Sequence, residues 1–394
     1  MRTRTRPRLV SLLIAAVLLF LSASTEAGAT PVPSWLVNTI ETWQWSSPSP
    51  DPSGLAYDAA SNRLLVADGE VDELSIYGGA NYYETTLGGN LHRTTNALVA
   101  FSHEPVGLAL GPPGRLFISD DNQQRVFEIT LGADGAFGLG DPVTSFATPA
   151  LGNNDPEGLS YDPIGNRLFI AGGEFSQVFE VLPVDGVFGN GNDQVRQFDT
   201  MPLGVTDPEV VEFNPDSGTL YLATANGNKI VKVTTSGALV SQIDTSYVPL
   251  SEPAGMAYAP RSTDPTRKSI YISDRKVDND RHPDENDGAI YEIAVGPLPV
   301  TLKLSDRTPR TGGRVRFFGT VSPALDGEPL LIQRRTRRGS FQTVARTTLR
   351  DAGDRRSKFS RRLRVFRDSV FRARVAASEH HLAGTSARKR VDAR

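Results

Sequence analysis

The sequence of 394 residues contains no cysteine, five histidines and three methionines. Without cysteine the chain has no disulfide, no thiolate nucleophile and no thiolate metal ligand. No Gly-x-Ser-x-Gly turn presents a serine nucleophile, and no glycine-rich loop followed by lysine provides a phosphate cradle. Cysteine catalysis is therefore excluded, and an enzyme of this sequence would be a metal-assisted hydrolase that uses carboxylates and a bound water.

Long apolar runs are also missing, except at the N-terminus. Four arginines between residues 2 and 8 precede an apolar stretch at 9–21, and small residues at 27–29 form a cleavage pattern. The stretch is shorter than the roughly 20 residues that a spanning helix needs, which favours a signal peptide over the alternative, a membrane anchor. We expect residues 1–29 to be a signal peptide and the mature chain to be secreted or held in the cell envelope.

The net charge of −3 hides an opposition between two parts of the chain. Residues 30–296 carry 14 Lys and Arg against 36 Asp and Glu, whereas residues 297–394 carry 24 against 8. Such opposed charges predict two domains with different surfaces, separated near the Pro297-Leu298-Pro299 linker.

An acid-proline phrase followed by a short apolar run recurs five times. The phrases start at Asp51, Glu104, Asp155, Asp207 and Glu252. Counted from Gly54, successive equivalent positions are 53, 51, 52 and 45 residues apart. A repeat of about this length built only from short strands is typical of a propeller blade.

The third repeat shows the expected blade. Its four alternating strands fall at 158–163, 166–173, 177–183 and 194–200. The fifth repeat has only three such strands, and the segment from Asn38 to Trp45 resembles the missing fourth. We therefore expect an all-β, five-bladed propeller closed by its N-terminal strand, with six blades as the alternative.

The repeated phrase, as in Asp155-Pro156-Glu157-Gly158-Leu159-Ser160-Tyr161-Asp162-Pro163, resembles NHL-type and SMP-30/gluconolactonase-like propellers over residues 38–295. It is closer still to the bacterial SdiA-regulated and phytase-like propeller groups. These families include lactonases, phosphatases, sensors and binding modules, so the resemblance predicts a fold and not an activity.

The SMP-30 resemblance implies a divalent metal over the channel, held by a Glu, an Asn and an Asp. The nearest matches are Glu157 or Glu209, Asn226 and Asp274, although no blade has the full Glu-Gly-Pro entry of that family. A ring of acids around a small opening repels itself unless a cation neutralises it. The alternative is that the acid-proline pairs cap strand ends and make turns.

A second candidate metal site is the loop from residue 274 to 288. Its closely spaced carboxylates suit the hard oxygen coordination of Ca²⁺: Asp274, Asp278, Asp280, Asp284 and Asp287. The spacing does not follow an EF-hand, and Arg275 and Arg281 dilute the negative charge. A solvated acidic loop that ends in an Asp-Gly turn is the alternative.

Residues 297–394 contain short strands with turn signals that predict an immunoglobulin-like sandwich. Arginines alternate with apolar residues, as in Arg314, Arg316, Arg372 and Arg374, so period-two geometry directs the guanidinium groups outward. This basic face should attract anions such as an anionic cell-wall polymer, lipid headgroups or the propeller's own acidic surface, and the alternative is a solvated face without a specific partner. Nucleic acid is disfavoured because Phe317 and Phe371 are expected to point inward.

Taken as function, the sequence predicts an exported propeller protein that binds an unknown small molecule or protein at its propeller face and is stabilised by calcium. The alternative is a metal-dependent hydrolase of the lactonase or phosphoesterase type, with its site over the channel.

Overall fold

The structure is a computed structural model that describes residues 32–224, 229–277, 285–322, 324–353, 356–378 and 383–394. The expected signal peptide lies outside these residues. The described residues form strands and five short 3₁₀ helices: η1 (Thr42–Gln44), η2 (Val71–Glu73), η3 (Ala97–Ala100), η4 (Pro149–Leu151) and η5 (Met201–Leu203). Within them, no helix has the length and apolar character needed to cross a membrane.

Four antiparallel sheets follow one another along the chain, each with its four strands in sequence order. The first is β2 (Pro52–Asp58), β3 (Arg63–Asp68), β4 (Tyr82–Thr86) and β5 (Leu91–Thr95). The second is β6 (Pro105–Leu110), β7 (Arg115–Asp120), β8 (Arg125–Thr130) and β9 (Val143–Ala147). The third is β10 (Pro156–Asp162), β11 (Arg167–Gly172), β12 (Gln177–Leu182) and β13 (Gln194–Asp199). The fourth is β14 (Pro208–Asn214), β15 (Thr219–Thr224), β16 (Lys229–Thr234) and β17 (Leu239–Asp244).

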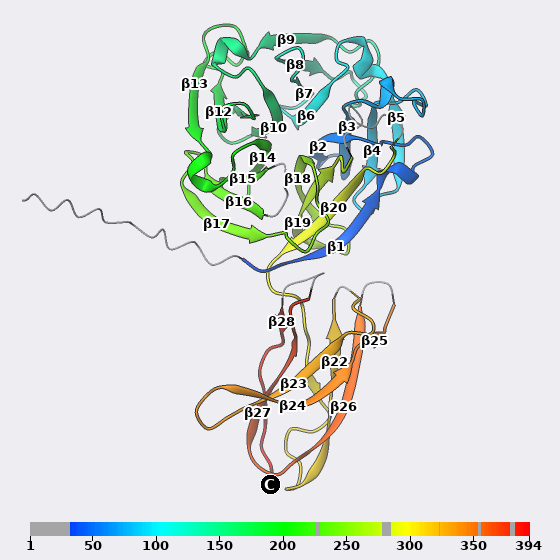
Figure 1. Cartoon of the computed structure of the whole chain (residues 1–394), viewed down its shortest axis with the longest axis vertical. Coiled ribbons are helices and arrows are strands. Elements are labelled where there is room, and N and C mark those ends of the chain that lie inside the picture. The colour runs from blue at the N-terminus through cyan, green and yellow to red at the C-terminus, as the bar shows by residue number, and fades with distance from the viewer. Residues whose placement is uncertain (1–31, 225–228, 278–284, 323, 354–355, 379–382) are drawn as a thin grey trace, which may run out of the picture.

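A fifth sheet joins the two ends of this region. It contains β18 (Pro253–Arg261), β19 (Asp264–Asp274), β20 (Ala289–Val295) and, on its outer edge, β1 (Ser34–Glu41). β1 pairs antiparallel with β20, with Thr39 opposite Tyr291, so the N-terminal strand completes the last sheet as predicted. Figure 1 shows the five sheets arranged around a common axis, the arrangement of a β-propeller.

The bounds of this closing strand differ from the expected 38–45. The strand ends at Glu41 because η1 follows, with the Thr42 hydroxyl donating to the carbonyl of Ser49 at 2.6 Å. Trp45 therefore does not lie beside Tyr291. Its ring packs 5.5 Å from that of Tyr83 in the first sheet, and its indole N–H donates to Gly89 at 3.1 Å.

The innermost strands β2, β6, β10, β14 and β18 contact one another in a closed cycle. Four of them carry glycine where the next strand approaches, at Gly54, Gly107, Gly158 and Gly255. A Cβ at Gly107 would lie within 3 Å of the backbone of β10, and one at Gly255 would meet the carbonyl of Ser53. The glycines of the repeat thus let neighbouring sheets pack closely around the axis.

Between the sheets lie continuous apolar layers. Two connecting loops reinforce them, since Phe137 packs edge-on against Tyr82 and Phe188 packs edge-on against Phe117. The aspartates of these loops make turns: Asp141, for example, accepts the backbone N–H groups of Gly132 and Gly138.

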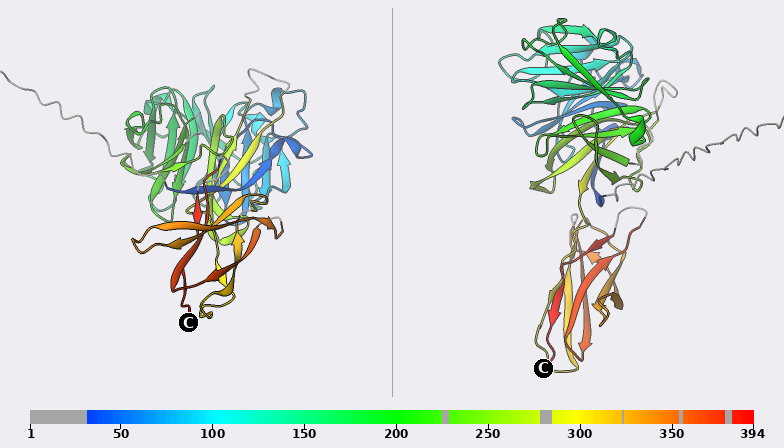
Figure 2. Two further views of the ribbon diagram at one scale, coloured as in Figure 1. Left: turned by 60° about the horizontal axis from the view of Figure 1, so that its bottom comes forward. Right: turned by 90° about the vertical axis from the view of Figure 1, so that its left-hand side faces the viewer.

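The C-terminal part contains two further sheets. One is β21 (Lys303–Leu304), β22 (Gly313–Val321), β26 (Ser357–Val365) and β25 (Arg350–Asp351). The other is β24 (Phe341–Thr348), β23 (Pro329–Arg335), β27 (Ser369–Val375) and β28 (Gly384–Thr385), with β29 (Lys389–Val391) also paired to β27. Figure 2 shows these sheets at one side of the propeller.

A single apolar core fills the C-terminal part and reaches the propeller. Phe317 and Phe371 are buried with ring centroids 4.8 Å apart, as the alternation of their strands predicted. Trp35 of β1 and Ala294 of β20 belong to the same cluster of buried residues. The edge of the closing sheet therefore packs directly on the C-terminal core.

Candidate functional site

The residue that directly follows the proline of the repeated phrase lies at one end of the axis in every inner strand. The five residues at this position are Ser53, Val106, Glu157, Glu209 and Ala254. Only β10 and β14 supply an acid there, so the negative charge gathers on one side of this opening, which we call the acidic mouth.

Three carboxylates converge at the acidic mouth. Asp121 follows β7, Asp155 precedes β10, and Glu157 is the second residue of β10. One oxygen of each lies within 4.8 Å of the others, and no other described residues form such a group. Backbone N–H groups orient two of them: Asn122 donates to Asp121 at 2.8 Å and Glu174 to Asp155 at 2.9 Å.

Burial and repulsion by neighbouring acids disfavour the ionised forms of Glu157 and Asp121. Desolvation raises the pKa of Glu157 well above its ordinary value, and the negative charges of Glu209, Asp121 and Asp155 raise it further. Desolvation also raises the pKa of Asp121 to about 6. Closely spaced acids of this kind hold a proton or a cation near neutral pH.

A second acid pair and an arginine border the cluster. A terminal nitrogen of Arg275 lies 3.8 Å from Glu209 Oε2. Burial raises the pKa of Glu209 to about 7, although the Arg275 charge acts in the opposite direction. Desolvation, together with the charge of Asp155, raises the pKa of Asp207.

Gly173, which follows β11, leaves room for this arrangement. A Cβ built there would lie 2.6 Å from Asp155 Oδ2 and 2.9 Å from Asp207 Oδ1. Any side chain at this position must therefore displace carboxylates of the acidic mouth.

The metal ligands predicted from the sequence have different roles in the structure. Glu157 and Glu209 lie at the acidic mouth. Asp274 is fully buried, and its carboxylate accepts backbone N–H groups of Ser251, Glu252 and Lys276. These bonds are those of a strand-end cap, the alternative that the sequence left open.

The same capping role is seen at equivalent positions of other sheets. Asp68 accepts the N–H groups of Asp51 and Val71. Asp120 accepts the N–H of Gln123 at 2.7 Å. The acid that ends the second strand of a sheet is thus a structural element of the repeat.

The predicted loop site is only partly described. Asn226, Asp278, Asp280 and Asp284 lie outside the described residues. Asp287 is partly buried, and desolvation raises its pKa. Its neighbour Asn286 donates to the backbone carbonyl of Trp43 at 3.4 Å, which places this end of the loop beside η1. Calcium binding by the loop stays a prediction.

The opposite end of the axis, which we call the aromatic mouth, has a different chemistry. A cavity of about 320 Å³ opens there, lined by residues of all five inner strands. Its aromatic side chains are Tyr57, Tyr161, Phe213 and Tyr258, and its one acid is Glu212.

Glu212 occupies a repeat position that otherwise holds only small residues: Ala56, Ala109, Ser160 and Ala257. Its carboxylate bridges to the neighbouring inner strands, because Oε2 accepts the Ser160 hydroxyl at 2.8 Å and Oε1 accepts the Tyr258 N–H at 2.7 Å. Desolvation raises the pKa of Glu212 to about 7 despite these bonds. The carboxylate thus links β14 to the strands on either side of it.

A profile of the SdiA-regulated family matches residues 39–251, more than half of the chain. The chain belongs to the SdiA-regulated family. Within this family member, the match covers β2 to β17 and includes both mouths of the axis.

Solved structures with similar folds have low sequence identity to this SdiA-regulated protein. The periplasmic gluconolactonase PpgL of Pseudomonas aeruginosa is 13% identical, with 87% of this chain and 86% of that one covered and a TM-score of 0.34. The dihydro-heme d1 dehydrogenase NirN is 10% identical over 95% of this chain and 77% of that one, with a TM-score of 0.33. A nidogen–laminin complex is 16% identical over 62% and 86%, with a TM-score of 0.32. No curated protein matches the chain.

Four residues that the structure places around the axis were not among the ligands predicted from the sequence: Asp121, Asp155, Arg275 and Glu212. Asp155 and Asp121 had a signal, since both border motifs already identified in the repeat. For Glu212 the signal was a break in the repeat, because an acid replaces alanine or serine at one position of five.

Proposed function

We propose that this SdiA-regulated protein is an exported propeller binding protein that holds a divalent cation, Ca²⁺, at its acidic mouth. The observation that carries the proposal is the convergence of Asp121, Asp155 and Glu157 within 4.8 Å. Glu157 belongs to the ligand set that the sequence suggested, Asp274 is a strand-end cap instead, and Asn226 lies outside the described residues.

The donor chemistry fits calcium. All three groups are hard carboxylate oxygens, and Ca²⁺ accepts six to eight such ligands from carboxylates, carbonyls and water. A bound cation would also remove the repulsion that raises the pKa of Glu157. Its chemistry would be charge neutralisation and the positioning of a ligand over the axis.

The proposal includes the architecture in which this mouth sits. The five four-stranded sheets and their closed cycle of inner strands support a propeller of five blades in residues 30–296. The two sheets of residues 303–391 and their shared core support an immunoglobulin-like module in residues 297–394. Export rests on the signal peptide pattern of residues 1–29.

Thermal unfolding of the mature chain with Ca²⁺ or with EDTA tests the cation site. Saturating Ca²⁺ at about 100 times its Kd should stabilise the protein by about 2.7 kcal/mol. The double substitution Asp121→Asn and Glu157→Gln should abolish this gain while leaving the fold intact. A control is Asp185→Asn, which changes an exposed carboxylate in the loop between β12 and β13, outside the cluster. Equal calcium responses in the wild type and the double variant would contradict the proposal.

A metal-dependent hydrolase is the second candidate, favoured by the position of Glu209 beside both the acid cluster and Arg275. A carboxylate next to a metal site can accept a proton from an attacking water, and an arginine can hold an anionic substrate. Turnover of simple lactones and phosphoesters in the presence of Ca²⁺ or Mn²⁺ would favour this function. Glu209→Gln should then stop turnover yet preserve stabilisation by the cation.

A further inference from the structure

The outer face of the sheet β21–β22–β26–β25 gathers exposed basic side chains. Along β22, Val315 and Phe317 are buried in the core while Arg314 and Arg316 are exposed. On β26, Phe359 and Val365 are buried and Leu363 is half-buried, whereas Lys358, Arg362 and Arg364 are exposed. Strand geometry therefore collects the basic side chains of this sheet on the side away from the core.

Several of these cations lie directly opposite one another across the sheet. Arg314 pairs with Arg364, and Arg316 pairs with Arg362. On the other side of β26, Arg350 pairs with Lys358. Like charges at directly opposed positions destabilise a sheet, so the fold accepts a cost here that a bound anion would remove.

A hollow of about 630 Å³ lies on this face. Its lining includes five cationic side chains and no acidic one: Lys303, Arg316, Arg350, Arg356 and Lys358. Hydroxyl groups of Thr347, Thr348 and Ser360 add hydrogen-bond donors among the cations, while those of Thr301 and Thr320 bond to each other. We call this hollow the basic groove.

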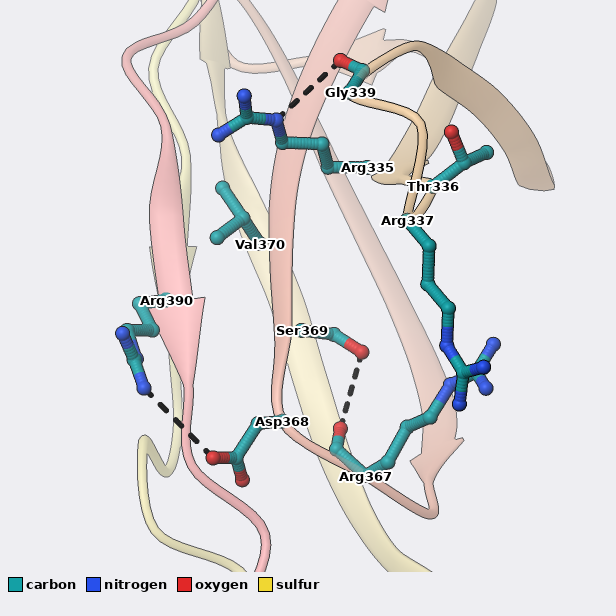
Figure 3. A pocket seen from close by; sticks show the side chains of 9 residues that line it. All are labelled: Arg335, Thr336, Arg337, Gly339, Arg367, Asp368, Ser369, Val370 and Arg390. Carbon is teal, nitrogen blue, oxygen red and sulfur yellow. Dashed lines mark hydrogen bonds and ion pairs between the residues drawn. The ribbon is translucent and has the colours of Figure 1, made fainter.

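A second basic pocket on the same module makes the contrast clear. This pocket, of about 650 Å³, contains Asp368 among its arginines. Figure 3 shows Arg390 directed towards Asp368, at 3.7 Å, whereas Arg337 and Arg367 extend to another edge of the pocket. Arg390 also contacts Asp392 at 2.5 Å. The positive charge of this second pocket is therefore partly neutralised by Asp368 and Asp392. The residues that line the basic groove include no acid.

We propose that the basic groove binds an anionic polymer whose repeating units are joined by phosphodiesters, such as a polyol phosphate chain of the cell envelope. Several cations in one hollow attract successive charges of one chain, and arginine suits phosphate because its planar guanidinium donates two parallel hydrogen bonds. The site lies on a different module from the acidic mouth, and its existence does not depend on the cation site.

The aromatic chemistry of the groove favours a polyol over nucleic acid. Single-stranded nucleic acids bind through bases stacked on exposed aromatic rings. The outward aromatic residue of β22, Phe318, has its ring covered by the guanidinium of Arg316, at 4.4 Å from the ring centroid. The groove thus offers charge and hydroxyl donors, which suit a backbone of phosphates and polyol.

Binding of poly(glycerol phosphate) of defined length to the full mature chain, measured at several salt concentrations, tests the proposal. The double substitution Arg316→Gln and Lys358→Gln should weaken binding at least about tenfold at low salt and lower the salt slope by about two. Both side chains are exposed, and the change removes opposed like charges, so the variant should unfold at the same temperature as the wild type or higher.

The matched control is Arg337→Gln with Arg367→Gln, which removes the same charge from the other basic pocket. The control should keep nearly wild-type affinity. Equal losses in the two double variants would mean that net charge alone attracts the polymer, and the groove would not be a site. Absence of binding by the wild type, or tighter binding of a single-stranded oligonucleotide of equal charge, would also overturn the proposal.

Discussion

The two mouths of the propeller axis both hold partly buried carboxyl groups with raised pKa values, but they differ in how many acids meet. At the acidic mouth, Asp121, Asp155 and Glu157 converge, and Glu209 lies beside them. At the aromatic mouth, Glu212 is the single acid of its cavity. The electrostatic cost therefore has a different origin at each mouth: repulsion among several acids at the acidic mouth, and desolvation of one acid at the aromatic mouth.

This difference indicates whether a divalent cation or a proton relieves the electrostatic cost at each mouth. Repulsion among several carboxylates is removed by one divalent cation that binds them together. Desolvation of one hydrogen-bonded carboxylate is removed by a single proton. The acidic mouth should therefore respond to calcium, and the aromatic mouth to pH alone.

The largest expected effect is a fall in stability with rising pH that calcium largely removes. The folded pKa values of Glu212, Glu209 and Asp121 are all raised, to about 7, 7 and 6. The folded state then binds protons more tightly than the unfolded state, so these groups stabilise fully below their unfolded pKa values and lose that contribution as pH rises through 6 to 7. In EDTA the free energy of unfolding should fall by several kcal/mol between pH 5 and pH 8.

Calcium should compensate for most of this fall, because a cation stabilises the ionised carboxylates at pH 8 and competes with protons at pH 5. Urea unfolding at the two pH values, with calcium or EDTA, gives the four free energies needed. A calcium effect that is larger at pH 5 than at pH 8 would contradict the assignment of carboxylate ligands.

The second effect isolates the aromatic mouth. Burial raises the pKa of Glu212 from 4.5 to about 7, which corresponds to a loss of about 3 kcal/mol of stability when the group ionises at high pH. Glu212→Gln keeps an acceptor for the Tyr258 N–H and cannot ionise. The variant should be more stable than the wild type at pH 8 by up to that amount, and little different at pH 5. Its response to calcium should equal that of the wild type, and a diminished response would connect the two mouths.

A smaller effect is expected at Gly173. A Cβ there would lie 2.6 Å from Asp155 Oδ2, so Gly173→Ala must move this carboxylate. We expect the calcium affinity, measured by titration calorimetry, to fall about tenfold, which is about 1.4 kcal/mol. Gly186→Ala is a steric control, since its Cβ would meet nothing within 4 Å. Gly186 also has a positive φ of 83°. Its substitution therefore shows the effect of backbone strain alone, because the added Cβ does not touch the acids. Unchanged affinity in Gly173→Ala would place the cation away from Asp155.

The fold was predictable from the sequence because every repeat carries the same signals. Alternating strands, glycines at the inner positions and the partner strand for β20 all recur or fill an evident gap. The strand end at Glu41 was less evident, since the bond from Thr42 to the carbonyl of Ser49 has no counterpart in the alternation of side chains.

The site was less predictable because residues of the same type have different roles. Asp274 and Asp121 both end or follow a second strand, yet Asp274 accepts backbone N–H groups while Asp121 joins a cluster of acids. Only the relative positions of neighbouring sheets separate these roles. Arg275 and Glu209 are far apart in sequence, and the closed ring brings them together.

The smallest predicted effect concerns the hydroxyl that supports Glu212. Ser160 donates to Glu212 Oε2 at 2.8 Å and accepts the N–H of Phe213 at 2.8 Å. The hydroxyl lowers the pKa of Glu212 against the larger effect of burial. Ser160→Ala should therefore raise the pKa of Glu212 further and cost about 1 kcal/mol of stability at pH 8, where the carboxylate is ionised. At pH 5 the cost should be smaller, and in the Glu212→Gln background the pH dependence of the cost should disappear. An equal cost in stability at both pH values would show that Ser160 acts only through the Phe213 N–H. Its hydroxyl would then have no effect on the ionisation of Glu212.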